Sequence, residues 1–101
     1  MKNFPNVELV KFPELDEADC VALDSAVAHF VRKVGEDSKL HLSLKQYKKE
    51  GLRTQHEVHA RLVMGGREFV ASYKGWMLLD VIQRVLKKVE KEVDKAFSKK
   101  D

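Results

Sequence analysis

Cysteine is almost absent from this sequence, and long apolar runs are absent altogether. The single Cys20 has no second cysteine with which to form an internal disulfide. No apolar stretch approaches the ~20 residues that a membrane-spanning helix needs, or the shorter apolar core of a secretion signal. We therefore expect a cytoplasmic protein that does not contact a membrane.

Recognisable catalytic and cofactor motifs are also missing. His56 and His59 are three residues apart, a spacing that sends them to opposite faces of a strand, so they cannot share a metal ion. Cys20 lies early in an acidic helical segment, which does not favour a nucleophilic thiolate. The pair Gly65-Gly66 has the surroundings of a hairpin turn, not of a phosphate-binding loop. We expect no enzymatic activity, no metal and no cofactor.

The length and composition fit one folded domain that spans residues 1–101. A chain of this size buries roughly 60 to 68% of its unfolded surface around one core. Hydrophobic residues make up 44% of the chain and charged residues 35%, which indicates a globular protein with a heavily charged surface. The net charge of +3 is unevenly distributed, because residues 1–37 contain twice as many acids as bases and the excess of Lys and Arg lies in residues 38–101. This asymmetry favours a polyanionic partner, although a well-solvated surface of mixed sign would produce it too.

The first half of the chain predicts a strand, a helix and a second strand. Residues 6–12 are rich in β-branched and aromatic side chains and precede Pro13. A helical spacing of apolar residues then runs from Asp16 to a stop at Gly35. Residues 39–47 alternate, with three leucines on one face and the polar side chains of Lys39, His41, Ser43 and Lys45 on the other.

The second half predicts a hairpin and a long helix. Residues 57–64 and 67–73 alternate in the same way around Gly65-Gly66, and Arg61 falls on the polar face. Residues 48–55 form a polar segment that we expect to be a mobile loop, with Lys48, Lys49 and Arg53 as its cations. The segment from Gly75 onward reads as a helix whose core face spans an arc of about 80° on a helical wheel and holds Leu78, Ile82, Val85, Val89, Val93 and Ala96. Four cations fall within about 60° of each other and nearly opposite that arc. We call Arg84, Lys88, Lys91 and Lys95 the basic stripe.

The expected order of elements is β-α-β-β-β-α, an α+β fold with a four-stranded sheet. Each strand and each helix has one apolar face, so both helices should pack on the same face of the sheet and leave the other open. The open face would carry His41, Lys45 and Arg61. Cations from the helix, the loop and the sheet then resemble the footprint of a nucleic-acid backbone. The simpler alternative is a solvated helix face.

The region from about Glu57 onward resembles the ribosome hibernation-promoting factor and ribosome-associated inhibitor family. The hairpin is followed by the sequence Ala-Ser-Tyr-Lys-Gly at residues 71–75, and the last helix begins immediately afterwards. Residues 88–95, Lys-Val-Glu-Lys-Glu-Val-Asp-Lys, retain the basic and apolar positions of the helix in that family, and Ile82 matches as well. Two features depart from the family pattern: the aspartate that usually caps the last helix is replaced, leaving Gly75 to serve, and the first helix has only Arg32 and Lys33 as cations.

The resemblance implies a factor that occupies the decoding region of the small ribosomal subunit and inhibits translation in idle ribosomes. It also implies that Lys88, Lys91 and Lys95 contact ribosomal RNA. The C-terminal dimerisation domain of the long-type relatives does not follow residue 101, so we expect a monomer when the protein is free. A double-stranded-RNA-binding domain is disfavoured, because residues 76–79 lack the lysine cluster that opens its last helix. The competing hypothesis is a protein-interaction module whose open sheet face binds an acidic partner or a second copy.

Overall fold

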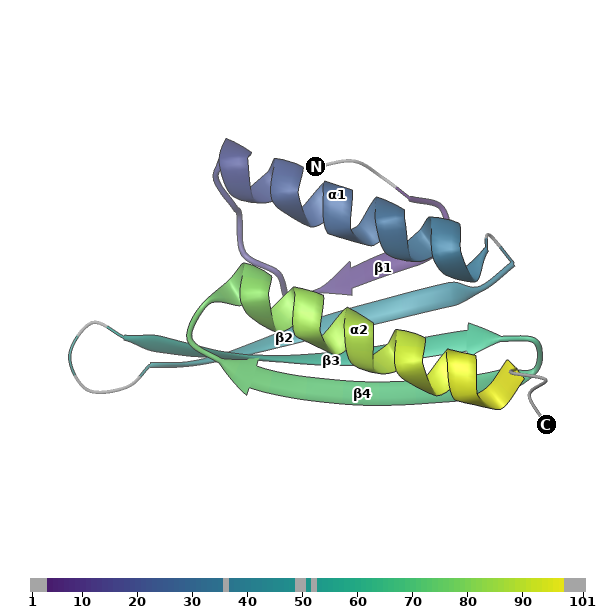
Figure 1. Ribbon diagram of the computed structural model, residues 1–101. Coiled ribbons are helices and arrows are strands. Elements are labelled where there is room, and N and C mark those ends of the chain that lie inside the picture. Colours follow the sequence, from purple (N-terminus) through teal and green to yellow (C-terminus); the bar gives the residue numbers. More distant parts are fainter. Residues whose placement is uncertain (1–3, 36, 49–50, 52, 98–101) are drawn as a thin grey trace.

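The predicted order of elements is confirmed by the structure, a computed structural model that describes residues 4–35, 37–48, 51 and 53–97. In chain order the elements are β1 (Val7–Val10), α1 (Glu17–Val34), β2 (Lys39–Lys48), β3 (Thr54–Met64), β4 (Arg67–Gly75) and α2 (Leu78–Phe97) (Figure 1). The domain is elongated, with extents of 50 × 26 × 18 Å. Much of its length comes from the β2–β3 hairpin, which projects beyond the helices at one end (Figure 1).

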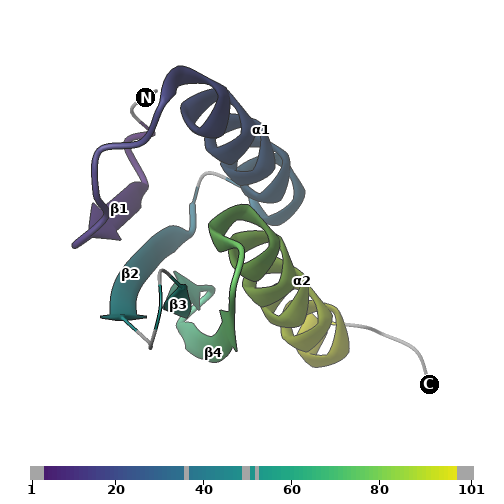
Figure 2. The same ribbon diagram turned by 90° about the vertical axis from the view of Figure 1, so that its left-hand side faces the viewer.

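The sheet is mixed and has the strand order β1-β2-β3-β4. β1 pairs in parallel with β2, whereas the other two pairs are antiparallel. Both helices lie on the same side of this sheet, as the view along the strands shows (Figure 2). One face is therefore covered and the other, which we call the open face, is exposed. This is the α+β arrangement that the alternation of the strands predicts.

Helix α1 begins and ends where its sequence predicts. The carboxylate of Asp16 accepts a hydrogen bond from the backbone N–H of Asp19 at 2.8 Å, which caps the helix N-terminus. Glu17 and Asp19 lie in the first turn, where acids interact favourably with the helix dipole. Gly35 ends the helix with φ of 94°, a conformation that a side chain would disfavour.

The core lies between the helices and the covered face. Leu40, Leu42 and Leu44 of β2 are at most 2% exposed and pack with alternate residues of the neighbouring strands. From α1 the core receives Leu23, Val27 and Phe30. From α2 it receives six buried side chains: Val81, Ile82, Val85, Leu86, Val89 and Val93. Together these side chains form one hydrophobic cluster.

The tight turn between β3 and β4 forms at Gly65 and Gly66, as predicted. Their φ angles are 58° and 75°, so both occupy the left-handed region that a two-residue hairpin turn of this type requires. Met64 pairs with Arg67 directly across the turn.

Three predicted boundaries are wrong. The first strand covers only Val7–Val10, because Lys11 has a φ of 63° and takes the chain out of the strand. The segment 48–55 is not wholly a loop: Lys48 ends β2 and pairs with Thr54, the first residue of β3. Gly75 does not cap α2, since it ends β4 and pairs with His56. The chain turns into α2 at Met77, whose carbonyl accepts from the backbone N–H of Val81 at 3.0 Å.

Candidate nucleic-acid interface

The basic stripe does not lie opposite the core, contrary to the sequence-based expectation. All four of its side chains are exposed, but Lys88 Nζ donates a hydrogen bond to the carbonyl of Ser72 in β4 at 3.0 Å. The Lys88 ammonium and the Arg84 guanidinium each lie 5.5 Å from the centre of the Tyr73 ring. The stripe is therefore turned toward the outer edge of β4, which is an edge strand of the sheet.

The basic stripe lies closer to β4 than expected because the buried arc of α2 is wider than the sequence indicated. The sequence-based arc omitted Val81 and Leu86, which are 0% and 4% exposed. On a wheel of 100° per residue they extend the arc to about 140°, and Lys88 then falls only about 20° from Val81. The line most distant from the core holds Asp80, Lys87 and Asp94, all exposed. The outermost line of α2 thus has mixed charge, and Lys87 is a further exposed cation that was not among the predicted RNA contacts.

The two halves of the stripe differ in their surroundings. Arg84 Nε donates to both carboxylate oxygens of Asp80, at 3.1 and 3.0 Å, and this hydrogen bonding raises the pKa of the guanidinium above its ordinary value. Lys88 is held by Ser72, as described above. For Lys91 and Lys95 no hydrogen bond or ion pair is found within the described part of the chain. Lys91 and Lys95 are therefore the stripe cations most available to a partner.

On the open face, most of the predicted cations are already paired with carboxylates. Glu8 of β1 stands beside His41 of β2 in the parallel register, and the two side chains form a hydrogen bond that is also an ion pair when His41 is protonated. Arg61 of β3 forms an ion pair with Glu68 of β4. A third carboxylate, that of Glu57, lies 3.2 Å from His59 Nε2. Lys45 is exposed. The open face therefore has much less net positive charge than its cations alone suggest.

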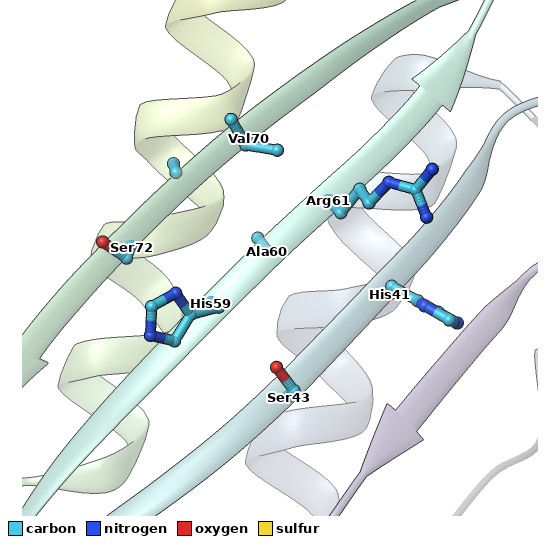
Figure 3. A pocket seen from close by; sticks show the side chains of 8 residues that line it. His41, Ser43, His59, Ala60, Arg61, Val70 and Ser72 are labelled. Carbon is cyan, nitrogen blue, oxygen red and sulfur yellow. The ribbon is translucent and has the colours of Figure 1, made fainter.

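A hollow of about 520 Å³ lies on this face across β2, β3 and β4 (Figure 3). Polar side chains from the three strands line it, together with Val70, which is 64% exposed. Figure 3 shows Arg61 and His41 on one side of the hollow and His59 with Ser72 on the other. The helices lie behind the sheet in this view, so the hollow and the basic stripe are on opposite sides of the sheet (Figure 3). The predicted cations therefore do not form a single flat patch, and the edge of β4 separates them.

Of the three cations predicted for the segment 48–55, the structure describes Lys48 and Arg53. Lys48 is an exposed residue of β2, and Lys49 lies outside the described residues. Arg53 stacks over Trp76, with its guanidinium carbon 4.0 Å from the ring centre. This contact joins the end of the β2–β3 hairpin to the connection between β4 and α2.

One residue beside these cations, Lys74, was not among the predicted RNA contacts. Lys74 of β4 lies over the ring of Tyr47, 5.5 Å from its centre. The hydroxyl of Tyr47 donates to Glu57 at 2.8 Å, a bond that raises the pKa of the phenol and lowers the pKa of the carboxyl group. Strand alternation would have placed Lys74 on the open face, since Tyr73 points inward. The contacts of Lys74 with Tyr47 and of Tyr47 with Glu57, in contrast, depend on the register of the strands, which strand alternation does not give.

The residues considered for metal binding or nucleophilic chemistry lie apart in the described part of the chain. No cluster of three or more His, Cys, Asp or Glu side chains is present among those residues. Cys20 is half-buried, and its thiol donates to the carbonyl of Leu15 at 3.6 Å. His56 and His59 alternate along β3 and so point to opposite faces, as expected, and burial lowers the pKa of His56. Within the described residues no helix has the length and apolar character needed to cross a membrane.

Comparisons with known proteins identify the fold. No protein-family model matches the sequence, and none of the curated proteins matches it significantly. Among solved structures, the chain is similar to the N-terminal domain of Protein Y from Thermus thermophilus, with a TM-score of 0.59 and 13% identity over 89% of this chain and 94% of that one. A minor lipoprotein from Acinetobacter baumannii also matches over 90% of this chain and 94% of that chain, but with 6% identity and a TM-score of 0.37 it supports no argument. Protein Y belongs to the hibernation-promoting factor family, so the resemblance seen in the sequence is confirmed by the structure at the level of the fold.

Proposed function

We propose that this protein is a ribosome-binding factor that occupies the decoding region of the small subunit and inhibits translation in idle ribosomes. The observation that carries the proposal is the fold shared with the N-terminal domain of Protein Y, in a chain whose α2 exposes a row of cations. The RNA contacts would come first from Lys91 and Lys95, which the described residues leave unneutralised. Arg84 and Lys88 would extend this contact along the edge of β4.

The remaining predicted cations would contribute a second, weaker contact. Lys45 and Lys48 lie exposed in β2, and Arg53 lies at the hairpin end. His41 and Arg61 would have to exchange their carboxylate partners for phosphate oxygens, which reduces the net gain of each contact. Together with Lys49, these residues complete the set of proposed RNA-binding positions. We propose that the protein acts in the cytoplasm and is a monomer when free, which sedimentation equilibrium at low micromolar concentration would test.

Co-sedimentation with purified ribosomes at low and moderate salt is the direct test. The protein should travel with small subunits and whole ribosomes, less so as the salt concentration rises, because each phosphate contact releases counterions that salt replaces. Prior occupancy of the decoding region by messenger and transfer RNA should reduce its binding. A protein that stays in the supernatant at low salt would contradict the proposal.

The alternative function is a protein-interaction module. It is favoured by the exposed apolar side chains on the open face, Val63 at 38% and Val70 at 64%. Such a module would bind an acidic protein or a second copy through the open face and would not sediment with ribosomes. Replacing Val70 with aspartate should abolish that interaction, because the new carboxylate would lie in the contact and repel an acidic partner.

A further inference from the structure

Two exposed aromatic rings belong to the end of the sheet where the β2–β3 hairpin projects. Tyr47 is 38% exposed and Trp76 is 43% exposed. Tyr47 pairs with Gln55 across β2 and β3, and the next residue of β3, His56, pairs with Gly75 of β4. Trp76 directly follows Gly75, so both rings occur at the same end of the sheet.

A cation lies over each of these rings. The Arg53 guanidinium carbon is 4.0 Å from the centre of the Trp76 ring, and Lys74 Nζ is 5.5 Å from the centre of the Tyr47 ring. Both distances are within the ~6 Å range of cation–π contacts. The result is two pairs, each of an aromatic ring and a cation, at the same exposed end of the sheet.

The core does not explain these rings. Phe30 and Phe69 are at most 9% exposed and belong to the buried cluster, and the ring of Tyr73 packs against it. Trp76, by contrast, is exposed, and its neighbour Met77 is 70% exposed. A large aromatic side chain held at the surface under a guanidinium group is more informative than a buried one, because burial alone does not account for it. Aromatic planes interleaved with cations are typical of sites that bind single-stranded nucleic acid.

The Tyr47 ring is fixed in its orientation before any ligand binds. Its hydroxyl donates to Glu57 at 2.8 Å, and Lys74 holds one face of the ring. An aromatic plane that is already oriented loses less conformational freedom when a base stacks on it. The carboxylate of Glu57 lies at the hydroxyl end of the ring, where it would repel a phosphate group and favour the uncharged base.

We propose that Trp76 and Tyr47, with Arg53 and Lys74, form a stacking site for unpaired nucleobases of single-stranded RNA. The bases stack on the two rings, and the two cations contact the adjoining phosphates or stack on the bases. This inference rests on the proposed function in one respect, since it takes RNA to be the partner. It adds a chemical class, the unpaired base, and a location that is separate from the basic stripe. Double-stranded RNA is excluded, because its bases already stack on each other.

The test uses the fluorescence of Trp76, which is the only tryptophan of the chain. A single-stranded oligoadenylate should quench this emission with a saturable dependence on concentration. An abasic ribose-phosphate chain of equal length and a duplex RNA should quench it little. Affinities of variants are measured by the anisotropy of a labelled oligoadenylate. Trp76→Leu should weaken binding by about 5- to 100-fold, Trp76→Phe by much less and Arg53→Gln by an intermediate factor.

Phe97 offers a matched control at the opposite end of the domain. It is 43% exposed, the same fraction as Trp76, and the Arg67 guanidinium carbon lies 5.2 Å from the centre of its ring. Phe97→Leu should leave the affinity for oligoadenylate unchanged. Circular dichroism and thermal melting show whether each variant is folded.

The outcomes separate this inference from the proposed function. If the abasic chain quenches as strongly as oligoadenylate, or if folded Trp76→Leu binds as tightly as the wild type, the stacking site is wrong. Such a result leaves co-sedimentation of the wild type with ribosomes unaffected. If oligoadenylate quenches Trp76 but the protein does not co-sediment with ribosomes, the proposed function fails and the stacking site stands.

Discussion

The exposed side of α2 and the open face of the sheet both carry cations, but these cations differ in how far they are neutralised. On the open face, His41 and Arg61 each face a carboxylate from a neighbouring strand. On α2, Arg84 is paired within its own helix, whereas Lys91 and Lys95 have no carboxylate partner among the described residues. The positive charge of a surface therefore depends on which strands and turns lie beside each other, and not only on its Lys and Arg residues.

The largest expected effect follows from removing the whole basic stripe. Replacing Arg84, Lys88, Lys91 and Lys95 with glutamine should weaken ribosome binding by orders of magnitude at low salt. The slope of log affinity against log salt should flatten by roughly 0.7 to 0.9 for each residue that contacts a phosphate. Binding across a salt series measures both effects. A folded variant with unchanged affinity and slope would show that the stripe is only a solvated surface.

The fold should survive this change with a modest loss of stability. Exposed substitutions usually alter the free energy of unfolding by no more than about 0.5 kcal/mol each. Lys88 is the exception, because it donates to the Ser72 carbonyl, and its loss should cost about 1 kcal/mol. Thermal melting is the control. Lys99 and Lys100 lie outside the described residues, and their replacement by glutamine should affect ribosome binding much less than replacement of the stripe.

A direct comparison of the two surfaces should give the next largest effect. The double variant Lys91→Gln/Lys95→Gln should weaken ribosome binding several-fold more than His41→Gln/Arg61→Gln. The reason is that Arg61 is already neutralised by Glu68 and His41 is hydrogen-bonded to Glu8, so less positive charge is lost from the surface. Ribosome affinity at one low salt concentration is the measurement. Equal losses would mean that the pairing with carboxylates does not matter for binding.

Removing the carboxylates that pair with His41 and Arg61 should have the opposite effect on ribosome binding. Glu8→Gln/Glu68→Gln should release His41 and Arg61 and strengthen ribosome binding a few-fold, with a steeper dependence on salt. Glu17→Gln/Asp19→Asn in the first turn of α1 removes the same charge elsewhere and is the matched control. If both double variants change the affinity equally, the effect is one of net charge and the open face has no contact with RNA.

The smallest effect concerns the ionisation of Tyr47. Its phenol donates to Glu57, so the pKa of Tyr47 in the folded protein is raised above 10. A raised pKa means that the bond stabilises the fold below the ordinary pKa of tyrosine and that this stabilisation is lost as pH rises through the folded-state value. In a Tyr73→Phe background only Tyr47 titrates by ultraviolet absorbance, and Glu57→Gln should lower its midpoint. An unchanged midpoint would contradict the assigned hydrogen bond.

Most of the fold could be predicted from the sequence because it depends on local patterns. Alternation around Leu40, Leu42 and Leu44 identified the strand and its buried face, and Asp16 and Gly35 marked both ends of α1. The boundaries that were wrong lie where pairing extends beyond the pattern. Lys48 and Thr54 have polar sequences around them, yet they pair because two long antiparallel strands continue their ladder past the core.

The candidate site was less predictable for a related reason. The identity of the exposed cations follows from their spacing along one element, and all of those that the structure describes are at the surface or half-buried. Their partners belong to other elements: Ser72 for Lys88, Glu8 for His41 and Trp76 for Arg53. These contacts join residues that are 16 or more positions apart in the sequence, so no local pattern contains them.

By itself, the sequence determined the order of the elements, the apolar face of each one and which cationic side chains lie at the surface. These properties depend on side-chain periodicity, which is set by the geometry of one strand or one helix. Only the tertiary structure decided the rotation of α2 over β4 and the strand register. Rotation and register fix which charges are neutralised and which rings stay exposed, because they depend on how the faces of several elements fill one core together.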